Sequence, residues 1–315
     1  MIEGQGREVL GILGGMGPLS SAEFLRTIYE CTLGEREQDA PAVVMISDPA
    51  FPDRTTAFLA GEEHTVEGPL VAALEKLRGM GATRVVMCCM TVHHLLPRVP
   101  EELRRGVVSL PRLVVELLME TQGRHLLVCS SGTRAFRLLE REPLWERVRE
   151  RVILAGDEDQ AAIHRDLIYP MKRPCDLNAQ AALLETLLDR YGADGFVVGC
   201  SEVHILAKHV RGRGRPCVDP FRAIAEGLAA VPAGAAAGAD LERRDLSGKI
   251  RRTPKQGSRP RRAQAGPVSV FRPSAPGGAP PSAGRARTRR STLLRLGLPL
   301  CGTLAAAEAA AQQPP

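Results

Sequence analysis

Short, almost wholly apolar runs alternate along residues 8–230 with longer segments whose apolar residues recur at helical spacing. Strands that are apolar at nearly every position are typical of a parallel sheet covered by helices on both faces. The predicted strands are 8–13, 42–47, 84–89, 125–130, 151–156 and 196–201. The predicted helices include 19–33, 111–123, 133–142, 157–169, 178–192 and 219–230. The pattern therefore predicts an α/β fold.

The strand–helix pattern restarts near residue 100, which predicts two pseudo-symmetric lobes, each a parallel sheet flanked by helices. We expect the first α/β lobe to comprise residues 1–99 together with about 207–231, and the second to comprise 100–206. Ligands bind at the carboxyl ends of parallel strands, so an active site is expected in the cleft between the lobes.

Residues 232–315 have a different composition, rich in Ala, Gly, Pro and Arg, with Phe271 as the one aromatic residue. They hold 15 Lys and Arg against 4 Asp and Glu, a net charge of +11, so the chain's overall +6 leaves −5 on residues 1–231. We expect this basic tail to be disordered because it has too little apolar surface to bury. Two interpretations stay open for it: an arm that binds nucleic acid or anionic lipid, or an extension that arose at the end of a GC-rich gene. The rest of the chain has no general attraction to nucleic acid.

Two cysteines occur in the same local motif, 111 positions apart. VVMCCMTVHHLL (85–96) and FVVGCSEVHIL (196–206) both contain Cys-x-x-Val-His-x-Leu, and each follows an apolar run. Cys89 and Cys200 would thus lie at a strand end before a helix start, where the helix dipole favours a thiolate. In lobes that face each other the two thiols would meet across the cleft. The other six cysteines are expected to act as small apolar residues.

Several neighbouring residues could act on these thiols. His93, Glu202 and His204 follow the cysteines closely and are interpreted as local hydrogen-bonding residues or residues that tune the thiols. A metal site is the competing interpretation, but the chain has no Cys-x-x-Cys and the spacing does not suit structural zinc, so no metal is predicted.

Three further segments could bind a small anion. The glycine turn GILGGMGP (11–18) only partly matches a nucleotide-binding loop, yet its backbone can approach a ligand closely at a helix start. Arg54 lies in a loop after the second predicted strand, and Lys172 lies in IYPMK. Both are cations suited to carboxylates, although each could equally be a solvated surface charge.

Two opposed thiols together with cations suit one reaction in particular. Inverting a carbon centre requires a proton to leave from one face and another to arrive on the opposite face, so two acid/base groups must flank the carbon.

With these residues in place, the sequence resembles the aspartate/glutamate racemase family, whose members work without pyridoxal phosphate. The motifs that carry the resemblance run in the family's order over roughly residues 8–230: GILGGMGPLSSAEF, PDRT (52–55), CMTVHH (89–94), SSGT (130–133), IYPMK (168–172), GCSEVHIL (199–206) and VDPF (218–221).

The resemblance implies two related α/β lobes with the active site between them, often in a homodimer. The family's two cysteines fall on Cys89 and Cys200. Its substrate-binding positions fall on Met16, Arg54, Thr91, Ser130, Thr133, Lys172 and Ser201. One departure affects specificity: the family usually has an asparagine where this chain has Met90, so the preferred amino acid stays open.

The sequence therefore predicts a cofactor-independent amino-acid racemase, with aspartate or glutamate as the expected substrate. Two alternatives stay open: a dicarboxylate cis–trans isomerase on the same scaffold, and an amino-acid-binding protein without catalytic activity.

The first apolar run is too short for a signal peptide, and the eight cysteines lack a disulfide-type spacing, so we expect a cytoplasmic protein. No segment is a convincing membrane span, and a homodimer is the expected assembly.

Overall fold

The computed structural model describes residues 8–213 and 215–229. These residues belong to a single compact unit, Met1–Lys255. The basic tail, 232–315, lies outside the described residues, and so do the expectations drawn from it.

The first sheet has three parallel strands in the order β2-β1-β3. β1 (Val9–Gly14) is central, with β2 (Ala42–Ser47) on one side and β3 (Arg84–Met87) on the other. Leu10 marks the register, because it lies opposite Val43 on β2 and Arg84 on β3. Every residue of β1 is buried, as expected for a strand with a helix layer on each face.

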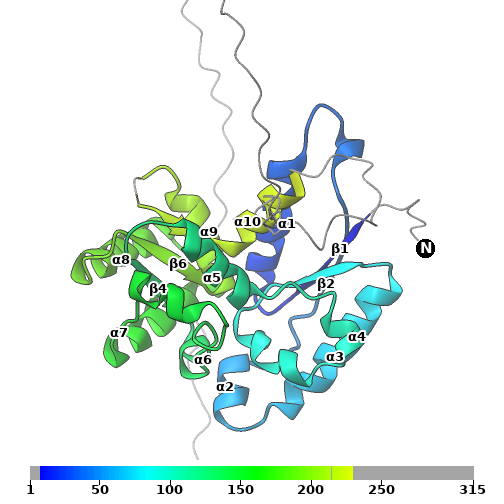
Figure 1. Cartoon of the computed structure of the whole chain (residues 1–315), viewed down its shortest axis with the longest axis horizontal. Helices are drawn as coiled ribbons and strands as arrows, with labels where there is room; N and C mark the ends of the chain where they lie inside the picture. The colour runs from blue at the N-terminus through cyan, green and yellow to red at the C-terminus, as the bar shows by residue number, and fades with distance from the viewer. Residues whose placement is uncertain (1–7, 214, 230–315) are drawn as a thin grey trace, which may run out of the picture. The chain divides into compact units, whose positions relative to one another are not determined.

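The second sheet has four parallel strands in the order β5-β4-β6-β7. They are β4 (His125–Cys129), β5 (Val152–Ile153), β6 (Gly195–Gly199) and β7 (Cys217–Val218). Cys129 lies opposite Gly199, so the carboxyl ends of the two central strands are level with each other. Two parallel sheets flanked by helices confirm the predicted α/β architecture (Figure 1).

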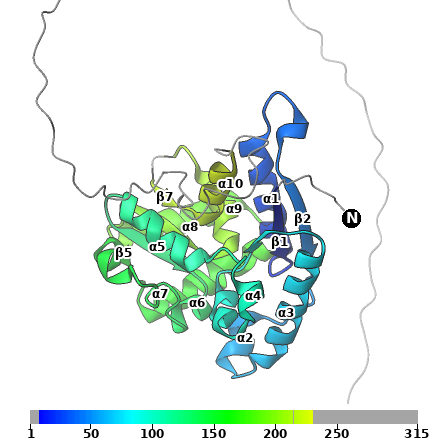
Figure 2. The same ribbon diagram turned by 45° about the vertical axis from the view of Figure 1, so that its right-hand side comes forward.

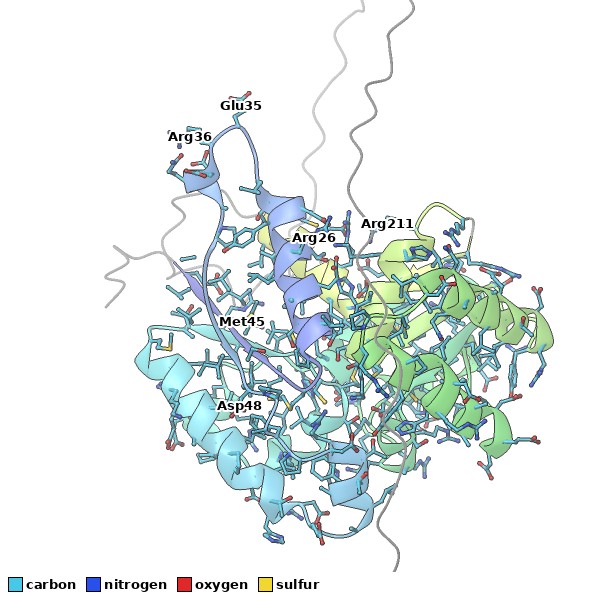
Figure 3. All side chains as sticks on the ribbon, turned by 180° about the vertical axis from the view of Figure 1, so that it is seen from behind. Arg26, Glu35, Arg36, Met45, Asp48 and Arg211 are labelled. Atoms are coloured by element: carbon cyan, nitrogen blue, oxygen red, sulfur yellow. The ribbon has the colours of Figure 1, made fainter. Side chains whose placement is uncertain are left out.

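Helices surround both sheets (Figures 1 and 2). The α-helices are α1 (Pro18–Thr32), α2 (Arg54–Leu59), α3 (His64–Gly79), α4 (Glu101–Arg104), α5 (Leu110–Glu120), α6 (Ser131–Ala135), α7 (Asp157–Ala162), α8 (Leu177–Arg190), α9 (Ser201–Val210) and α10 (Pro220–Ala229). The 3₁₀ turns are η1 (Glu37–Asp39), η2 (Thr91–Arg98), η3 (Trp145–Arg147), η4 (Arg149–Arg151) and η6 (Tyr169–Lys172), and η5 (Ile163–Ile168) is a π-helical turn. η1 belongs to the connection between α1 and β2, which carries Glu35 and Arg36 (Figure 3).

Two of the predicted helices are shorter than the sequence suggests. The segment 133–142 forms only the end of α6, because Arg137 adopts a left-handed backbone conformation with a φ of 50° that an α-helix cannot contain. The segment 157–169 divides into α7, η5 and the start of η6, where Pro170 lacks the N–H that would continue the helix.

The segment after residue 206 contacts elements of both lobes. β7 pairs with β6 in the second sheet, whereas α10 packs on α1, with the rings of Phe221 and Phe24 5.3 Å apart. The proposed lobe boundaries therefore stay a prediction.

Candidate active site

The two sheets present their carboxyl-terminal ends to one small cavity. Its volume is about 20 Å³, room for roughly one water molecule. The residues that line it are Met16, Asp53, Arg54, Thr55, Cys89, Thr91, Ser130, His164, Ile168, Tyr169, Lys172, Cys200 and Glu202. A larger hollow of about 360 Å³ lies among α9, β7 and α10, but neither Cys89 nor Cys200 lines it.

Cys89 reaches the cavity from the first sheet. It follows β3 by two residues and is buried, and its backbone N–H donates to the carbonyl of Met87 (2.7 Å). Arg54 lies close enough to interact with it. Burial acts to lower the pKa of Arg54, but Cys89 and Asp53 outweigh burial and hold the pKa of the guanidinium above its ordinary value. Cys89 is thus the cysteine with an arginine beside it.

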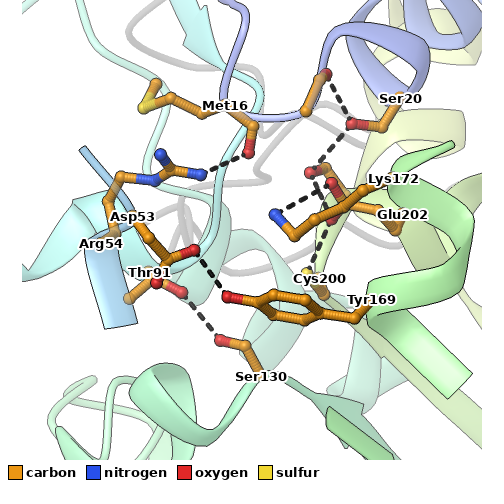
Figure 4. A network of polar contacts seen from close by, with 12 residues as sticks. Met16, Ser20, Asp53, Arg54, Thr91, Ser130, Tyr169, Lys172, Cys200 and Glu202 are labelled. Atoms are coloured by element: carbon orange, nitrogen blue, oxygen red, sulfur yellow. Dashed lines mark hydrogen bonds and ion pairs between the residues drawn. The ribbon is translucent and has the colours of Figure 1, made fainter. Parts of the chain in front are cut away.

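Arg54 is held by the backbone around it (Figure 4). It is the first residue of α2, which Asp53 caps, and only 7% of it is exposed. Its Nη1 donates to the carbonyls of Pro52 (2.6 Å) and Phe51 (3.3 Å), and its Nη2 donates to the carbonyl of Met16 (2.8 Å). Its Nε is buried and has no hydrogen-bond partner among the described residues, so it is available to an anion.

Cys200 reaches the cavity from the second sheet. It follows β6 directly and is the N-cap residue of α9, and its Sγ donates to Glu202 Oε2 (2.9 Å). Burial raises the pKa of the Cys200 thiol well above its ordinary value, the charge and hydrogen bond of Glu202 raise it further, and Lys172 opposes the shift. Cys200 therefore holds its proton at neutral pH, in an environment unlike that of Cys89.

Lys172 and Glu202 form an ion pair on the wall of the cavity, with Nζ 3.7 Å from Oε1 (Figure 4). The Lys172 ammonium also lies over the ring of Tyr169, 5.1 Å from its centroid. Ser201 donates to Glu202 Oε2 (3.2 Å) and receives a hydrogen bond from Ser20 of the first lobe (3.2 Å). Ser201 thereby supports the carboxylate without lining the cavity.

Three hydroxyl groups form a second polar cluster at the cavity. Thr91 Oγ1 lies 2.9 Å from Ser130 Oγ and 3.0 Å from Thr133 Oγ1. Thr91 and Ser130 line the cavity, and Thr133 lies behind them. Because either hydroxyl of each pair can be the donor, the cluster can reorient towards a donor or an acceptor on a ligand.

His93 and His204 lie outside the cavity lining. His93 Nδ1 contacts the carbonyl of Cys89 (2.9 Å), and its Nε2 accepts from the N–H of Leu110 (3.2 Å), so both ring nitrogens bond to backbone. His204 is fully buried between Asp219 (2.7 Å) and Thr27 (2.9 Å). Both imidazoles are engaged in the packing of the helices that follow the cysteines.

Asp53 and Tyr169 line the cavity but were not singled out from the sequence. Tyr169 donates from its hydroxyl to Asp53 Oδ2 (2.8 Å), a bond between segments 116 positions apart. Asp53 lies in the PDRT motif with Arg54, and Tyr169 lies in IYPMK with Lys172. These two motifs could therefore have identified Asp53 and Tyr169 as site residues. His164 also lines the cavity, and burial lowers the pKa of its imidazole.

Met90 does not line the cavity. It is 1% exposed and belongs to the larger apolar cluster, which joins residues of both sheets. The Met90 side chain therefore contributes to the core and does not affect the polarity of the cavity lining.

Among residues 8–213 and 215–229, no group of three or more His, Cys, Asp and Glu side chains is arranged to hold a metal ion. No helix in this part of the chain is long and apolar enough to cross a membrane.

Comparison with known proteins identifies the family. The model of the Asp/Glu/hydantoin racemase family matches residues 13–228. The chain belongs to this family. Its fold is similar to that of the aspartate racemase of Picrophilus torridus, with a TM-score of 0.62 and 20% identity over 70% of this chain and 92% of that one. It is also similar to a Yersinia pestis protein classed with the Asp/Glu racemases, with a TM-score of 0.52 and 19% identity over 70% and 97% of the two chains.

In this member of the Asp/Glu/hydantoin racemase family, the matched region contains every residue that lines the cavity and all of both sheets except residues 9–12 of β1.

Proposed function

We propose that the protein is a cofactor-independent amino-acid racemase that acts on aspartate or glutamate, with Cys89 and Cys200 as the two acid/base groups. One observation carries the proposal: two cysteines, each following a strand of a different sheet, line the same cavity. A stereocentre is inverted when one group removes the α-proton and a second group protonates the opposite face.

The two thiols start in different protonation states in this mechanism. The mechanism requires Cys89 to act as a thiolate, with the Arg54 guanidinium beside it, whereas burial and Glu202 keep the proton on Cys200. Cys89 takes the α-proton, so the C–H bond breaks and an S–H bond forms. The Cys200 S–H bond then breaks as its proton passes to the other face of the α-carbon. The opposite enantiomer reacts with the roles of the two cysteines exchanged.

Two cations are available to bind the carboxylates of the substrate. Arg54 has a buried Nε without a partner among the described residues, and Lys172 contacts the wall through Glu202 at 3.7 Å and the ring of Tyr169 at 5.1 Å. A cation on the α-carboxylate stabilises the negative charge that develops as the proton leaves, which lowers the barrier without a cofactor. Met16, Thr91 and Ser130 also line the cavity, while Thr133 bonds to Thr91 and Ser201 bonds to Glu202 from behind the lining.

A second function is favoured by the inequality of the two cysteines. In a cis–trans isomerase for dicarboxylates, one cysteine adds to the double bond and the other acts only as an acid, so unequal environments are expected. No α-proton exchanges with solvent in that reaction.

Proton NMR in D₂O separates these functions. L-Aspartate, L-glutamate and several neutral amino acids are incubated with the reduced protein, and the products are then separated by chiral chromatography. Loss of the α-proton signal together with appearance of the D-enantiomer supports the racemase and identifies its substrate. No exchange with any amino acid, combined with isomerisation of maleate to fumarate, would show that the racemase proposal is wrong.

The racemase is further proposed to be a homodimer, as the resemblance in its motifs implies, and to be cytoplasmic, as its cysteine spacing and short first apolar run favour. Analytical ultracentrifugation of the purified chain measures this directly, and a monomer at micromolar concentration contradicts it.

A further inference from the structure

One oxygen of Glu202 has unused hydrogen-bonding capacity. The side chain is 1% exposed, and Oε2 accepts from the Cys200 thiol and the Ser201 hydroxyl. Oε1 is buried and has no hydrogen-bond partner among the described residues; its polar neighbour is Lys172 Nζ at 3.7 Å, beyond hydrogen-bond distance. Leaving a buried carboxylate oxygen without a donor is costly, so this atom is suited to a donor that arrives with the ligand.

Both oxygens of the other carboxylate that lines the cavity already have a hydrogen-bond partner. Asp53 Oδ1 accepts from the backbone N–H of Thr56 (2.9 Å), and Oδ2 accepts from the hydroxyl of Tyr169 (2.8 Å). Asp53 therefore serves as a helix cap and joins the two walls. Of the carboxylates among the described lining residues, Glu202 alone has a buried oxygen without a hydrogen-bond partner.

Resting on the proposed function, we propose that Glu202 Oε1 binds the α-ammonium group of the substrate and restricts the site to amino acids with a free α-amino group. The two oxygens of one carboxylate then hold the Cys200 thiol and the substrate nitrogen side by side. Because the α-carbon is bonded to that nitrogen, this contact places it next to Cys200 Sγ, as reprotonation by Cys200 requires.

Binding in this position also gives Lys172 a different partner. The Lys172 side chain is 26% exposed, and its flexible four-carbon stem allows the ammonium to move. The substrate ammonium replaces it at Glu202 and simultaneously brings a carboxylate to which Lys172 can turn. Arg54 Nε, on the other side of the cavity, is the second donor for a carboxylate.

Glu202 has two simpler roles that must be separated from this one, as the partner of Lys172 and as the acceptor for Cys200. Neither of these roles distinguishes a ligand with an amino group from one without it. The test therefore compares two pairs of ligands: L-aspartate and L-glutamate, which have a free ammonium group, and succinate and N-acetyl-L-aspartate, which keep the carboxylates and lack it.

Dissociation constants are measured by isothermal titration calorimetry for the full-length wild-type protein, for Glu202→Gln and for Glu75→Gln. Glutamine preserves the size of Glu202 and removes its charge. Glu75 lies exposed on α3, so Glu75→Gln makes the same chemical change away from the cavity. Thermal unfolding shows whether Glu202→Gln is folded, and Glu202→Asp, which restores the charge on a shorter side chain, provides the conservative comparison.

A charge-assisted hydrogen bond predicts that Glu202→Gln weakens the binding of L-aspartate and L-glutamate by about ten- to a hundredfold. Succinate and N-acetyl-L-aspartate should bind as well or more tightly, because Lys172 loses its competing partner. Glu202→Asp should be intermediate and Glu75→Gln unchanged. Equal weakening of all four ligands, or no change in any, overturns the proposal, as does a wild-type protein that binds no free amino acid. A wild-type protein that shows the predicted selectivity but racemises nothing refutes the proposed function and leaves the ammonium site intact.

Discussion

The hydroxyl of Tyr169 donates to the carboxylate of Asp53 at 2.8 Å and joins η6 to the start of α2 across the cavity. Asp53 is adjacent in sequence to Arg54, and Tyr169 is three positions before Lys172, so each residue is close in sequence to a cation of the site. The cavity has room for roughly one water molecule, so a ligand as large as an amino acid can enter only after these walls separate.

Replacing Tyr169 by Phe should make the cavity open more often. The lost hydrogen bond involves a charged acceptor and contributes about 1.5–3 kcal/mol, so the open population should rise about tenfold or more. The alkylation rate of Cys89 and Cys200 by iodoacetamide, followed residue by residue by mass spectrometry, measures this. Tyr191→Phe is the matched control, because Tyr191 also donates to a carboxylate, Asp159, at 2.7 Å. Equal alkylation rates in Tyr169→Phe and the wild type would contradict a role in closure.

Cys89→Ala and Cys200→Ala should each reduce racemisation by about a thousandfold, because each removes one of two proton-transfer groups whose individual contribution is about 10²–10⁴. Chiral chromatography of the product measures the rate. Cys175→Ala, a partly buried cysteine that does not line the cavity, should retain wild-type activity. Full activity in either of the first two variants would rule out the two-thiol mechanism.

Gly17→Ala should displace Glu202. Gly17 has a φ of −146° that alanine also adopts, but a Cβ there would overlap Glu202 Oε1. The buried carboxylate must then move, and kcat/KM should fall at least tenfold with a loss of stability of about 1–3 kcal/mol. Gly79→Ala is the control, because a Cβ there would meet no atom within 4 Å. Steady-state kinetics and urea unfolding measure both effects, and a Gly17→Ala enzyme with normal kinetics would show that Glu202 need not lie here.

Met90→Asn should lower stability without changing the substrate. Burying an amide in place of the methionine loses apolar burial and leaves polar atoms in the core, which together cost about 2–4 kcal/mol. Because Met90 does not line the cavity, the ranking of amino-acid substrates should stay the same. Urea unfolding and relative kcat/KM values test this; a variant that gains activity towards aspartate would place residue 90 in contact with the substrate.

Acidification should destabilise the protein through His93. Burial lowers the pKa of the folded imidazole from 6.5, although its hydrogen bonds to backbone partly oppose the shift. Below about pH 6.5 the unfolded chain therefore takes up a proton that the folded chain does not, and the free energy of unfolding falls by up to about 1.4 kcal/mol per pH unit. Between pH 6.5 and 5 the wild type should lose more stability than His93→Gln, by no more than about 1.4 kcal/mol per pH unit. His64→Gln, at an exposed position, controls for the loss of a histidine. If His93→Gln showed the same pH dependence as the wild type, His93 would not be the group responsible for the loss of stability in acid.

The sequence by itself determined strands β1 to β6 and the positions of the two cysteines, but it did not predict the two-residue strand β7. A strand buried on both faces requires an uninterrupted apolar run, and this local constraint is visible at β1, β4 and β6 without any knowledge of their neighbours. Cys89 and Cys200 each come just after a buried parallel strand, so the sequence also predicted that each lies at the carboxyl edge of its own sheet, where ligands bind.

Only the tertiary structure decided which side chains reach the cavity. Met90 and Thr91 are adjacent, yet one packs in the core and the other lines the cavity, because the turn after β3 points successive side chains in different directions. His93 and His204 occupy the same place in the repeated motif, but helix packing gives each different partners. The bond from Tyr169 to Asp53 and the unpartnered oxygen of Glu202 depend on distances between segments far apart in the chain, and these distances are set by how the two sheets and their helices pack.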